Sequence, residues 1–201
     1  QDSSSITVNL PATNSYTYDL NGNLTSDGKR GFDYDDDNQL VRVTVTNGWK
    51  SEFVYDGKFR RRKRLEYTWA SPNWVKTNEV RYVYDGSLVI QERDANNLPQ
   101  VGYTRGTDLS GTLQGAGGIG GLLAFSQLST ISPQHSCYHA DGGGNISCLV
   151  SAQQIPVARY LFDPFGNILS QSGLLADANL YRFSSKEFHL NSALTYFLYR
   201  F

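Results

Sequence analysis

The sequence predicts an all-β fold built from repeated antiparallel β-hairpins, and three observations lead to this prediction. First, the composition suits strands and tight turns, because 13% of the residues are aromatic and 19 of the 201 are glycine. Second, a short turn-forming unit recurs along the chain. Third, the stretches between its copies alternate apolar and polar side chains, as strands with one buried face do. We therefore expect a strongly twisted, curved sheet or a part of a hollow β-shell.

The recurring unit consists of an aromatic residue, an aspartate, a few turn-forming residues, and then a polar residue followed by an aliphatic one. Its aspartate can accept hydrogen bonds from backbone N–H groups of the turn, while Gly or Asn provides a positive φ. The flanking aromatic and aliphatic side chains can then pack on one face of the hairpin. The copies are Tyr18-Asp19, Tyr34-Asp35, Tyr55-Asp56, Tyr84-Asp85, Asp141 to Asn145 with His139 in the aromatic position, and Phe162-Asp163 to Asn167.

A single repeat buries too little surface to be stable alone, so successive copies are expected to stack into one continuous sheet. We expect one domain over residues 1–201, divided into four parts. These are a lead-in (1–15), a run of repeats (16–100), a glycine-rich connector (101–136) and a final set of repeats (137–201). The two ends of such a sheet would expose unpaired strand edges, which can pair with another copy or another chain.

The charge and hydropathy of the chain limit its partners. With 18 basic and 19 acidic residues the formal net charge is −1, which provides no general attraction for nucleic acid or for an anionic membrane. The chain contains no apolar run of about 18 residues, the length needed for a membrane-spanning helix. The sequence from Gln1 also lacks the basic and apolar pattern of a secretion signal. We therefore expect no nucleic-acid partner, no membrane span and no cofactor.

Two cysteines, Cys137 and Cys148, flank the glycine-rich turn that begins at Asp141. If this turn is centred between Gly142 and Gly143, the two cysteines lie directly opposite each other in the hairpin. A cross-strand disulfide is then geometrically feasible. The alternative is a pair of small buried thiols.

The sequence contains only weak candidates for catalysis. A hydrolase built on this scaffold would use His139, Asp141 and Asp163, and Ser136 could complete a Ser–His–Asp group. The opposing interpretation is that both aspartates serve their turns and that His139 packs in its repeat. Together with His135 and the two cysteines, His139 also offers four ligands for zinc, but their spacing fits no established zinc motif. We therefore assign no catalytic residue and no metal site.

Three further motifs admit binding roles, and each has a structural alternative. The stretch from Gly115 to Gly120 matches G-x-G-x-x-G, but it lacks the strand and helix that a phosphate loop needs, so we expect a connector. The basic run Arg60 to Arg64 should alternate between the faces of a strand and meet solvent or acidic neighbours. Finally, Trp49, Trp69 and Trp74 could stack on sugars, although core packing is the commoner fate of such side chains.

The ordered set of motifs resembles the tyrosine-aspartate (YD) repeats of the rearrangement-hotspot (Rhs) family. The resemblance covers about residues 16–201, and the part from residue 137 onward is similar to the paired repeats near the end of Rhs cores. Besides the repeats themselves, the motifs that carry it are Tyr103 to Gly111, Gly115 to Ala124, Cys137 to Ser170 and Tyr181 to Phe188. One copy of the repeat alone would mean little, whereas this ordered set is specific.

The resemblance implies a sheet that spirals into a hollow shell around a variable C-terminal polypeptide, as in related bacterial toxins and toxin-delivery or cell-contact proteins. In many members the core ends in an aspartic self-cleavage region. This sequence ends at Tyr199-Arg200-Phe201, where that region would begin, so self-cleavage is assigned to no residue.

On this basis we expect an encapsulating segment of a secreted or surface-delivered, toxin-related protein, without catalysis of its own. Its partners would be the rest of a larger Rhs-type polypeptide or its cargo, with self-association through an exposed strand edge as a further prospect. Two alternatives stay open: a module that binds carbohydrates or cell surfaces, and a hydrolase on a β-scaffold.

Overall fold

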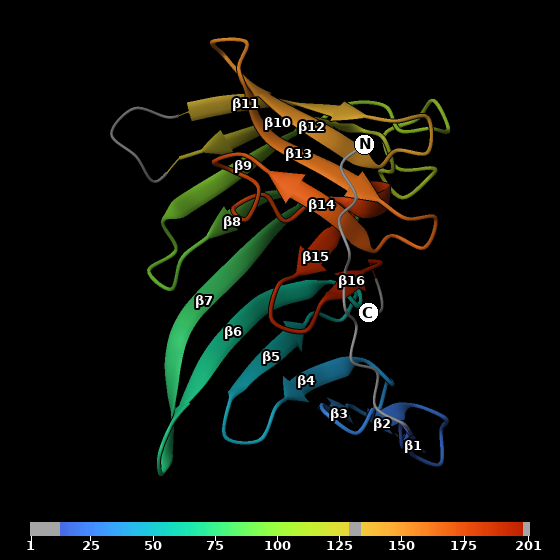
Figure 1. Ribbon diagram of the computed structural model, residues 1–201, viewed down its shortest axis with the longest axis vertical. Coiled ribbons are helices and arrows are strands. Elements are labelled where there is room, and N and C mark those ends of the chain that lie inside the picture. The colour runs from blue at the N-terminus through green and yellow to red at the C-terminus, as the bar shows by residue number, and fades with distance from the viewer. Residues whose placement is uncertain (1–12, 129–133, 199–201) are drawn as a thin grey trace, which may run out of the picture.

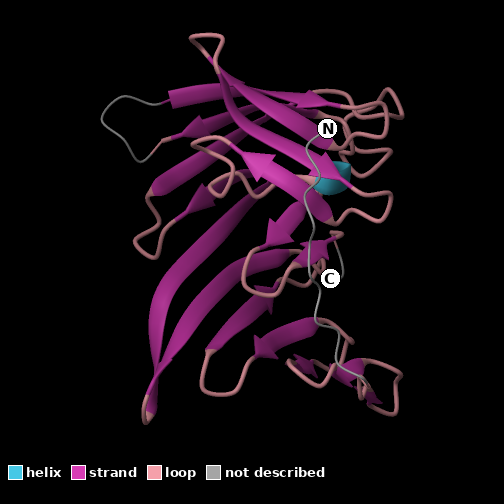
Figure 2. Ribbon diagram, viewed as in Figure 1, coloured by secondary structure: helices cyan, strands magenta, loops and turns pink. Residues whose placement is uncertain are grey.

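The computed structural model describes residues 13–128 and 134–198, and nearly all of them belong to strands, turns or connecting loops. Most of the predicted lead-in (1–15) lies outside the described residues. Fourteen strands form one antiparallel sheet, in which each strand pairs with its neighbours in sequence (Figures 1 and 2). The predicted all-β fold of repeated antiparallel hairpins is therefore confirmed, and the sheet is open rather than closed on itself.

The strands lengthen toward the middle of the sheet and shorten toward β1. The first seven are β1 (Thr17–Tyr18), β2 (Leu24–Ser26), β3 (Gly31–Tyr34), β4 (Leu40–Thr44), β5 (Trp49–Tyr55), β6 (Arg61–Ala70) and β7 (Asn73–Asp85). The second seven are β8 (Leu88–Arg93), β9 (Pro99–Arg105), β10 (Leu122–Gln127), β11 (Gln134–Ala140), β12 (Ile146–Ser151), β13 (Pro156–Phe162) and β14 (Ile168–Ser172). In the described residues no helix is long and apolar enough to cross a membrane.

A β-bulge or register shift occurs at the same place in all six predicted repeats. It lies between the second and the first residue before the repeat aspartate, for example between Val54 and Tyr55 and between Leu161 and Phe162. A bulge bends its strand and increases the local twist. Because the bulges recur on every second strand, the sheet curves progressively and has one concave face, as Figure 1 shows.

The turns that contain the repeat aspartates all follow odd-numbered strands, so they lie along one side of the sheet, which we call the repeat rim. Side chains connect the first five turns of this rim, from β1–β2 to β9–β10, each to the next, and these bonds hold neighbouring hairpins in register. The bonds are Asn21 Nδ2 to Asn38 Oδ1 (2.9 Å), Gln39 Nε2 to Phe59 O (3.3 Å), Arg60 Nη1 to Gly86 O (2.8 Å) and Gln114 Nε2 to Asp85 O (3.3 Å).

After β14 the chain turns onto the concave face and forms the C-terminal segment, residues 173–198. The turn occurs at Gly173, where φ is +107° and a Cβ would lie 2.4 Å from the carbonyl oxygen of Val157, so a side chain cannot be accommodated. The segment contains a 3₁₀ turn, η1 (Phe183–Ser185), and a hairpin of β15 (Glu187–His189) and β16 (Leu194–Tyr196). In Figure 1 it lies in the hollow of the curved sheet.

Two hydrophobic clusters join the C-terminal segment to the sheet. The larger cluster spans β7 to β13 and includes Tyr82, Phe125 and Leu149, with Tyr181 of the segment. The smaller cluster comprises residues of β3 to β5, against which Leu194 of the segment packs. Each fully buried large apolar side chain contributes about 1.5–3 kcal/mol of transfer free energy, so these contacts make the segment a part of the core.

Candidate functional site

The repeat aspartates act as turn acceptors. In five of the six repeats the aspartate accepts backbone N–H groups from the residues two and four positions later, at 2.8–3.1 Å. These are Asp19, Asp35, Asp56, Asp141 and Asp163. The side chains of Asn145 and Asn167 add bonds to the last two, at 2.9 and 2.6 Å.

The hydrogen bonds also set the charge state of these carboxyl groups. Burial acts to raise the pKa of Asp141, but the bonds from Asn145 outweigh it and the pKa is lowered. The bond from the Asn167 side chain is the main cause of the lowered pKa of Asp163. A carboxylate held ionised by turn donors is poorly suited to transfer protons near neutral pH.

Asp85 differs from the other repeat aspartates. It pairs directly with Leu88, so its hairpin closes around only Gly86 and Ser87 and leaves no longer turn for the carboxylate to cap. Conversely, Asp94 on the opposite rim accepts the N–H groups of residues two and four positions later, at 2.9 and 2.8 Å. The sequence pattern missed Asp94 because Arg93 precedes it instead of an aromatic residue.

Of the weak catalytic candidates, Asp141 and Asp163 line one open pocket of about 420 Å³, but neither His139 nor Ser136 lines it. His139 is exposed on β11, where it faces Cys148, whereas Ser136 is buried on the concave face. Residues separated by an odd number of positions in a regular strand point to opposite faces. Asp141 and Asp163 belong to separate turns, and their carboxylates are occupied there. In the described residues no group of three or more His, Cys, Asp or Glu side chains could hold a metal ion.

The bulge in β11 changes the predicted arrangement of the cysteines. Cys137 pairs with Val150 and Cys148 pairs with His139, because the register shifts between His139 and Ala140. The two cysteines are therefore diagonal neighbours, and the prediction that they lie directly opposite each other is wrong. Both are free thiols in this structure, and Cys137 is exposed while Cys148 is half-buried.

A row of buried aromatic side chains lines the concave face, and the sequence analysis missed it. Each lies three positions before a repeat aspartate: Phe32, Phe53, Tyr82, Tyr138 and Tyr160. The predicted aromatic position, one before the aspartate, is only partly buried where Tyr34, Tyr55, Tyr84 and Phe162 occupy it, and Tyr18 is exposed. The constant spacing to the aspartate was the signal that could have identified the inner row.

The tyrosines of this row bind the C-terminal segment through their hydroxyl groups. Tyr138 donates a 2.8 Å hydrogen bond to Oδ1 of Asn179, and Tyr160 donates a 2.7 Å bond to the carbonyl of Ala176. Tyr82 donates a 2.9 Å bond to Oε1 of Glu187. The concave face therefore offers polar groups at regular intervals, and the segment satisfies them.

The centre of this interface is a buried ionic group, which we call the carboxylate network: Arg61, Arg64, Glu66, Tyr82, Glu187 and His189. The carboxylate of Glu187 forms ion pairs with Arg61 through Oε2 and with Arg64 through Oε1, the latter at 2.6 Å. Arg61 also lies 4.5 Å from the ring centroid of Tyr82 and 4.3 Å from that of Tyr196.

A second part of the network joins Glu66 on β6 to His189 on β15. Nε2 of His189 lies 3.0 Å from Oε1 of Glu66, and its Nδ1 lies 2.6 Å from Oγ of Ser192. Although this is a Ser–His–Glu chain, Ser192 is only 2% exposed and its hydroxyl also accepts the N–H of Leu194 in the β15–β16 turn. It serves the turn and is closed to a substrate.

Two buried glutamates, Glu187 in the network and Glu92 beside it, have pKa values shifted in opposite directions. Burial acts to raise the pKa of Glu187, but the charges of Arg61 and Arg64 outweigh it and the pKa is lowered. Glu92, whose carboxylate accepts a 2.8 Å hydrogen bond from Tyr103, has a raised pKa because of burial and the neighbouring charge of Glu187. Glu187 therefore holds its negative charge, and Glu92 is the group that resists ionisation.

The predicted alternation of the basic run holds only in part, because Arg60 precedes β6 and because Arg61 and Arg64, three positions apart, are both buried on one side. Arg60 and Arg62 pair with Asp56 near the surface, at 2.8 and 3.8 Å. Arg61 and Arg64 are instead buried against the C-terminal segment, so the expectation of solvent or neighbouring-strand partners is wrong for these two.

The tryptophans also have local partners. Trp49 packs beside the smaller hydrophobic cluster and lies edge-on to His189. Trp69 and Trp74 face each other near the end of the β6–β7 hairpin, with ring centroids 5.1 Å apart and planes inclined by 65°. This edge-to-face geometry stabilises the hairpin.

Within the predicted glycine-rich connector (101–136), the loop 106–121 between β9 and β10 surrounds the carboxylate of its own residue Asp108. The carboxylate of Asp108 accepts hydrogen bonds from the backbone N–H groups of Ala116 and Gly118, at 2.7 and 3.0 Å, and from Ser110. Burial acts to raise the pKa of Asp108, but these bonds bring it down to about 2. The backbone donors that a phosphate loop would offer to a ligand are thus occupied, which supports the predicted role as a connector.

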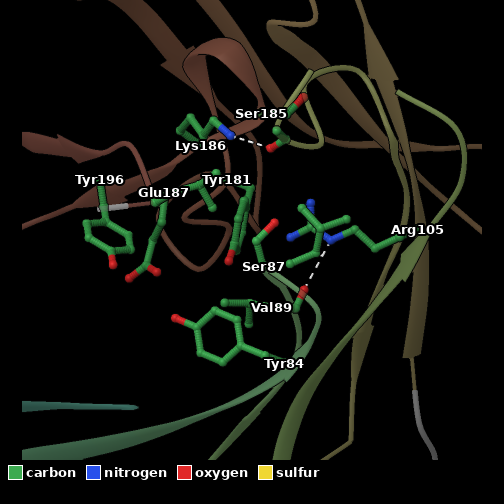
Figure 3. Close-up of a pocket in the computed structure, with 12 residues that line it drawn as sticks. Tyr84, Ser87, Val89, Arg105, Tyr181, Ser185, Lys186, Glu187 and Tyr196 are labelled. Atoms are coloured by element: carbon green, nitrogen blue, oxygen red, sulfur yellow. Dashed lines mark hydrogen bonds between the residues drawn. The ribbon is translucent and has the colours of Figure 1, made fainter. Parts of the chain in front are cut away.

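Several pockets border the C-terminal segment, and two of them are lined largely by its residues. One is an open pocket of about 380 Å³ lined by Arg64, Glu66, Asn78, His189 and Asn191 among others. The other is shown in Figure 3 and lies between the glycine-rich connector, β7 to β9 and the segment. Its free volume is about 20 Å³, enough for one small group.

Comparison with known sequences identifies relatives of much greater length. No family model matches the chain. The tRNA3(Ser)-specific nuclease WapA of Bacillus spizizenii (strain DSM 15029) is 27% identical, and the tRNA nuclease WapA of Bacillus subtilis (strain 168) is 29% identical, each over 192 residues. The match covers 93% of this chain and 7% of each relative.

Solved structures show the same fold. The complex TcdB2-TccC3-Cdc42 superimposes with a TM-score of 0.66 at 15% identity, and TcdB2-TccC3 with a TM-score of 0.62 at 14% identity. Each match covers 91% of this chain and 9% of the larger chain. The chain therefore corresponds to less than a tenth of the length of the proteins that it resembles.

Proposed function

We propose that this chain is a wall segment of an Rhs-type, toxin-related protein that is secreted or delivered to a surface, and that it has no catalysis of its own. The carboxylate network is the observation that carries the proposal. Side chains with catalytic potential, such as the buried His189 and Glu187 and the half-buried Glu66, bind the C-terminal segment to the sheet. The polar and charged side chains of the concave face therefore serve to stabilise the fold.

The two ends of the sheet support a role within a larger polypeptide. Among the described strands, β14 pairs only with β13, and exposed apolar side chains lie in or beside its hairpin, namely Leu161, Phe165, Leu169 and Leu174. At the other end Tyr16 and Tyr18 are exposed beside the single partner of β1, which is β2. Such edges favour pairing with further strands, and the relatives provide more than ten times the length of this chain.

The names of the curated relatives describe tRNA nucleases. The present chain matches only 7% of those proteins, and its net charge of −1 provides no electrostatic attraction for RNA. We therefore assign any nuclease activity to another part of the longer polypeptide. In this proposal the wall segment encloses or carries the active part.

The two alternative functions have less support. A glycan-binding surface would benefit from ring faces exposed side by side, whereas Trp69 and Trp74 pack edge to face. A hydrolase would need His139 close to a carboxylate and a nucleophile, and the structure separates it from Ser136. Neither alternative accounts for the buried network.

A substrate screen tests the absence of catalysis. The purified chain is assayed on tRNA and on ester, glycoside, peptide and phosphoester substrates, beside His139→Ala, Asp141→Ala and His189→Ala variants. We expect no turnover by any of them. Turnover by the parent chain that disappears in a folded variant would overturn the proposal and identify an enzyme.

A protection assay tests the wall function directly. A longer polypeptide that contains this segment is treated with protease, and the survival of its C-terminal cargo is followed with native sequence and with Glu187→Gln. The proposal expects protection in the native polypeptide and faster digestion of the cargo in the variant. Equal digestion of an unprotected cargo in both would contradict it.

A further inference from the structure

The pocket of Figure 3 contains two cationic side chains that have no ion-pair partner in the described residues. Arg105 and Lys186 both line it, while the ion pairs of residues 13–128 and 134–198 involve other cations. Lys186 is 6% exposed, and Arg105 is half-buried. Buried positive charge is costly unless a negative group compensates for it.

The neighbouring carboxylates cannot provide this compensation. Glu187 lines the same pocket, but Arg61, Arg64 and Tyr82 already occupy both of its oxygens. Asp108 is near enough to favour the charged form of Lys186, but its oxygens are held by four donors of its own loop. The pocket therefore retains an excess of positive charge.

Several donors of the pocket remain available to a ligand. Arg105 uses its Nε for a 3.1 Å hydrogen bond to the carbonyl of Val89, and its guanidinium lies 5.1 Å from the ring centroid of Tyr181, so its terminal nitrogens are not committed to described residues. Tyr181 is 5% exposed, and among the described residues its hydroxyl has no hydrogen-bond partner. Lys186 donates one bond, to the carbonyl of Gly117.

The shape of the pocket selects the kind of anion. Its inner part has a free volume of about 20 Å³, room for about one water-sized group, so only the small polar head of a ligand can enter it. Leu88, Val89 and Leu198 form an apolar part of the wall. A planar head with two oxygens on an apolar stem matches both the donors and the wall.

We infer that Arg105, Lys186 and Tyr181 form a binding site for a carboxylate, provided by a small organic acid or by an acidic side chain of a polypeptide. The guanidinium fork of Arg105 suits the two oxygens of such a group, and Lys186 neutralises its charge. The hydroxyl of Tyr181 adds a neutral donor. The site is independent of the proposed wall function.

Burial and the neighbouring charge of Arg105 lower the pKa of Lys186 to about 8, which provides a direct readout. A bound carboxylate favours the charged amine and raises this pKa. The experiment follows the side-chain NMR signal of Lys186 through a pH titration of the 201-residue chain, with acetate or with the blocked dipeptide acetyl-Asp-Gly-amide. Chloride and phosphate at matched ionic strength serve as comparison anions.

The inference expects saturable binding of the carboxylates and a raised pKa of Lys186. Arg105→Gln and Lys186→Gln should each weaken carboxylate binding by roughly 10-fold or more, which corresponds to the loss of one charge-assisted contact. The affinity is measured from the backbone chemical shifts of residues around the pocket. Tyr181→Phe, which removes only an unpartnered hydroxyl and keeps the ring, should weaken it by a smaller factor. The exposed Lys58→Gln is the matched control and should bind as the parent does.

Each outcome decides the matter. Tighter binding of the dipeptide than of acetate would identify a polypeptide side chain as the ligand, and equal binding would identify free small carboxylates. Absence of saturable binding, unchanged binding in a folded Tyr181→Phe and Lys186→Gln pair, or preferential binding of phosphate or chloride would overturn the inference. If the charge variants fail to fold, Tyr181→Phe and the anion comparison still decide between these results.

Discussion

The hydroxyl of Tyr82 donates a 2.9 Å hydrogen bond to the carboxylate of Glu187 across 105 positions of sequence. Both side chains are almost fully buried, at 1% and 2% exposure. Tyr82 belongs to the repeating inner row of the sheet, whereas Glu187 belongs to the segment that follows the last repeat. This contact therefore connects the repetitive part of the fold to its non-repetitive part, and the predictions below begin from it.

Glu187→Gln should be strongly destabilising. The variant keeps the size of the side chain but removes the negative charge that pairs with Arg61 and Arg64, and breaking a buried ion pair in this way typically costs about 3–5 kcal/mol. Denaturant unfolding of the parent and the variant measures the difference. Asp33→Asn is the control, because its ion pair with Arg42 is exposed and should change stability by less than about 1 kcal/mol. An equal effect of the two substitutions would contradict the prediction.

The stability of the chain should fall on acidification. The lowered pKa of Glu187 and that of Glu66 mean that their stabilising contributions are complete above about pH 4.5, the unfolded value, and are lost as the pH falls through the lower folded values. Burial lowers the pKa of His189, so below about pH 6.5 the unfolded chain takes up a proton that the folded chain resists. All three groups act in the same direction.

Unfolding free energies measured at several values between pH 7 and pH 3 check this behaviour. His189→Asn should reduce the slope in the upper part of this range, and Glu187→Gln should reduce it in the lower part. A slope that is unchanged in both variants would show that other groups control the acid response.

Glu92→Gln should have the opposite effect to Glu187→Gln. The raised pKa of Glu92 means that its contribution is complete below about pH 4.5 and is lost as the pH rises through the folded value, where a buried negative charge develops beside Glu187. The amide removes this charge and keeps an oxygen that can accept the hydrogen bond of Tyr103. We expect equal or greater stability at pH 7, and a loss of more than about 1 kcal/mol would contradict this account.

Asp141→Ala should destabilise its hairpin, whereas Asp85→Ala should have a smaller effect. Asp141 accepts three hydrogen bonds in its turn, and loss of such a cap costs about 1 kcal/mol. The side chain of Asp85 has no equivalent role in its two-residue turn. Thermal unfolding of the two variants makes the comparison at the same repeat position. Similar losses would show that the aspartate acts in some way other than by capping.

The two cysteines should stay reduced in the folded chain. Diagonal partners on adjacent strands have Cα positions farther apart than a disulfide usually allows, so closing the bond would strain the hairpin. Thiol titration of the folded chain should find Cys137 reactive and the half-buried Cys148 slower. Mass spectrometry after mild oxidation checks the result, and a native chain that forms the intramolecular bond readily would contradict it.

The fold could be predicted because each hairpin depends on residues that are close together in the sequence. An aspartate that caps a turn, a glycine or asparagine with positive φ and alternating side chains all act within about ten residues of sequence. These rules gave the hairpins and the curved sheet. The bulge before each aspartate also recurs, but it depends on how two strands pair, and so the predicted facing of Cys137 and Cys148 failed by a shift of register.

The candidate site could not be predicted, because its contacts depend on the path of the chain after β14. Arg61 and Glu187 are 126 positions apart, and neither has a periodic signature. The alternation of side chains along a strand indicated that the basic run divides between two faces. Which of these faces is buried depends on where the C-terminal segment packs. Local pattern thus determines the repeated hairpins of the sheet, while long-range packing determines where the buried charges find their partners.

The side-chain bonds along the repeat rim have a consequence for the growth of such proteins. Because the turns from β1–β2 to β9–β10 are each bonded to the next one, a hairpin duplicated beside β1 would meet the same kind of neighbour as the existing hairpins. With strands about 4.8 Å apart, every such duplication lengthens the sheet by roughly 10 Å and leaves the older contacts intact. In the proposed wall function, the dimensions of the enclosure would change in steps of one hairpin, independently of its contents.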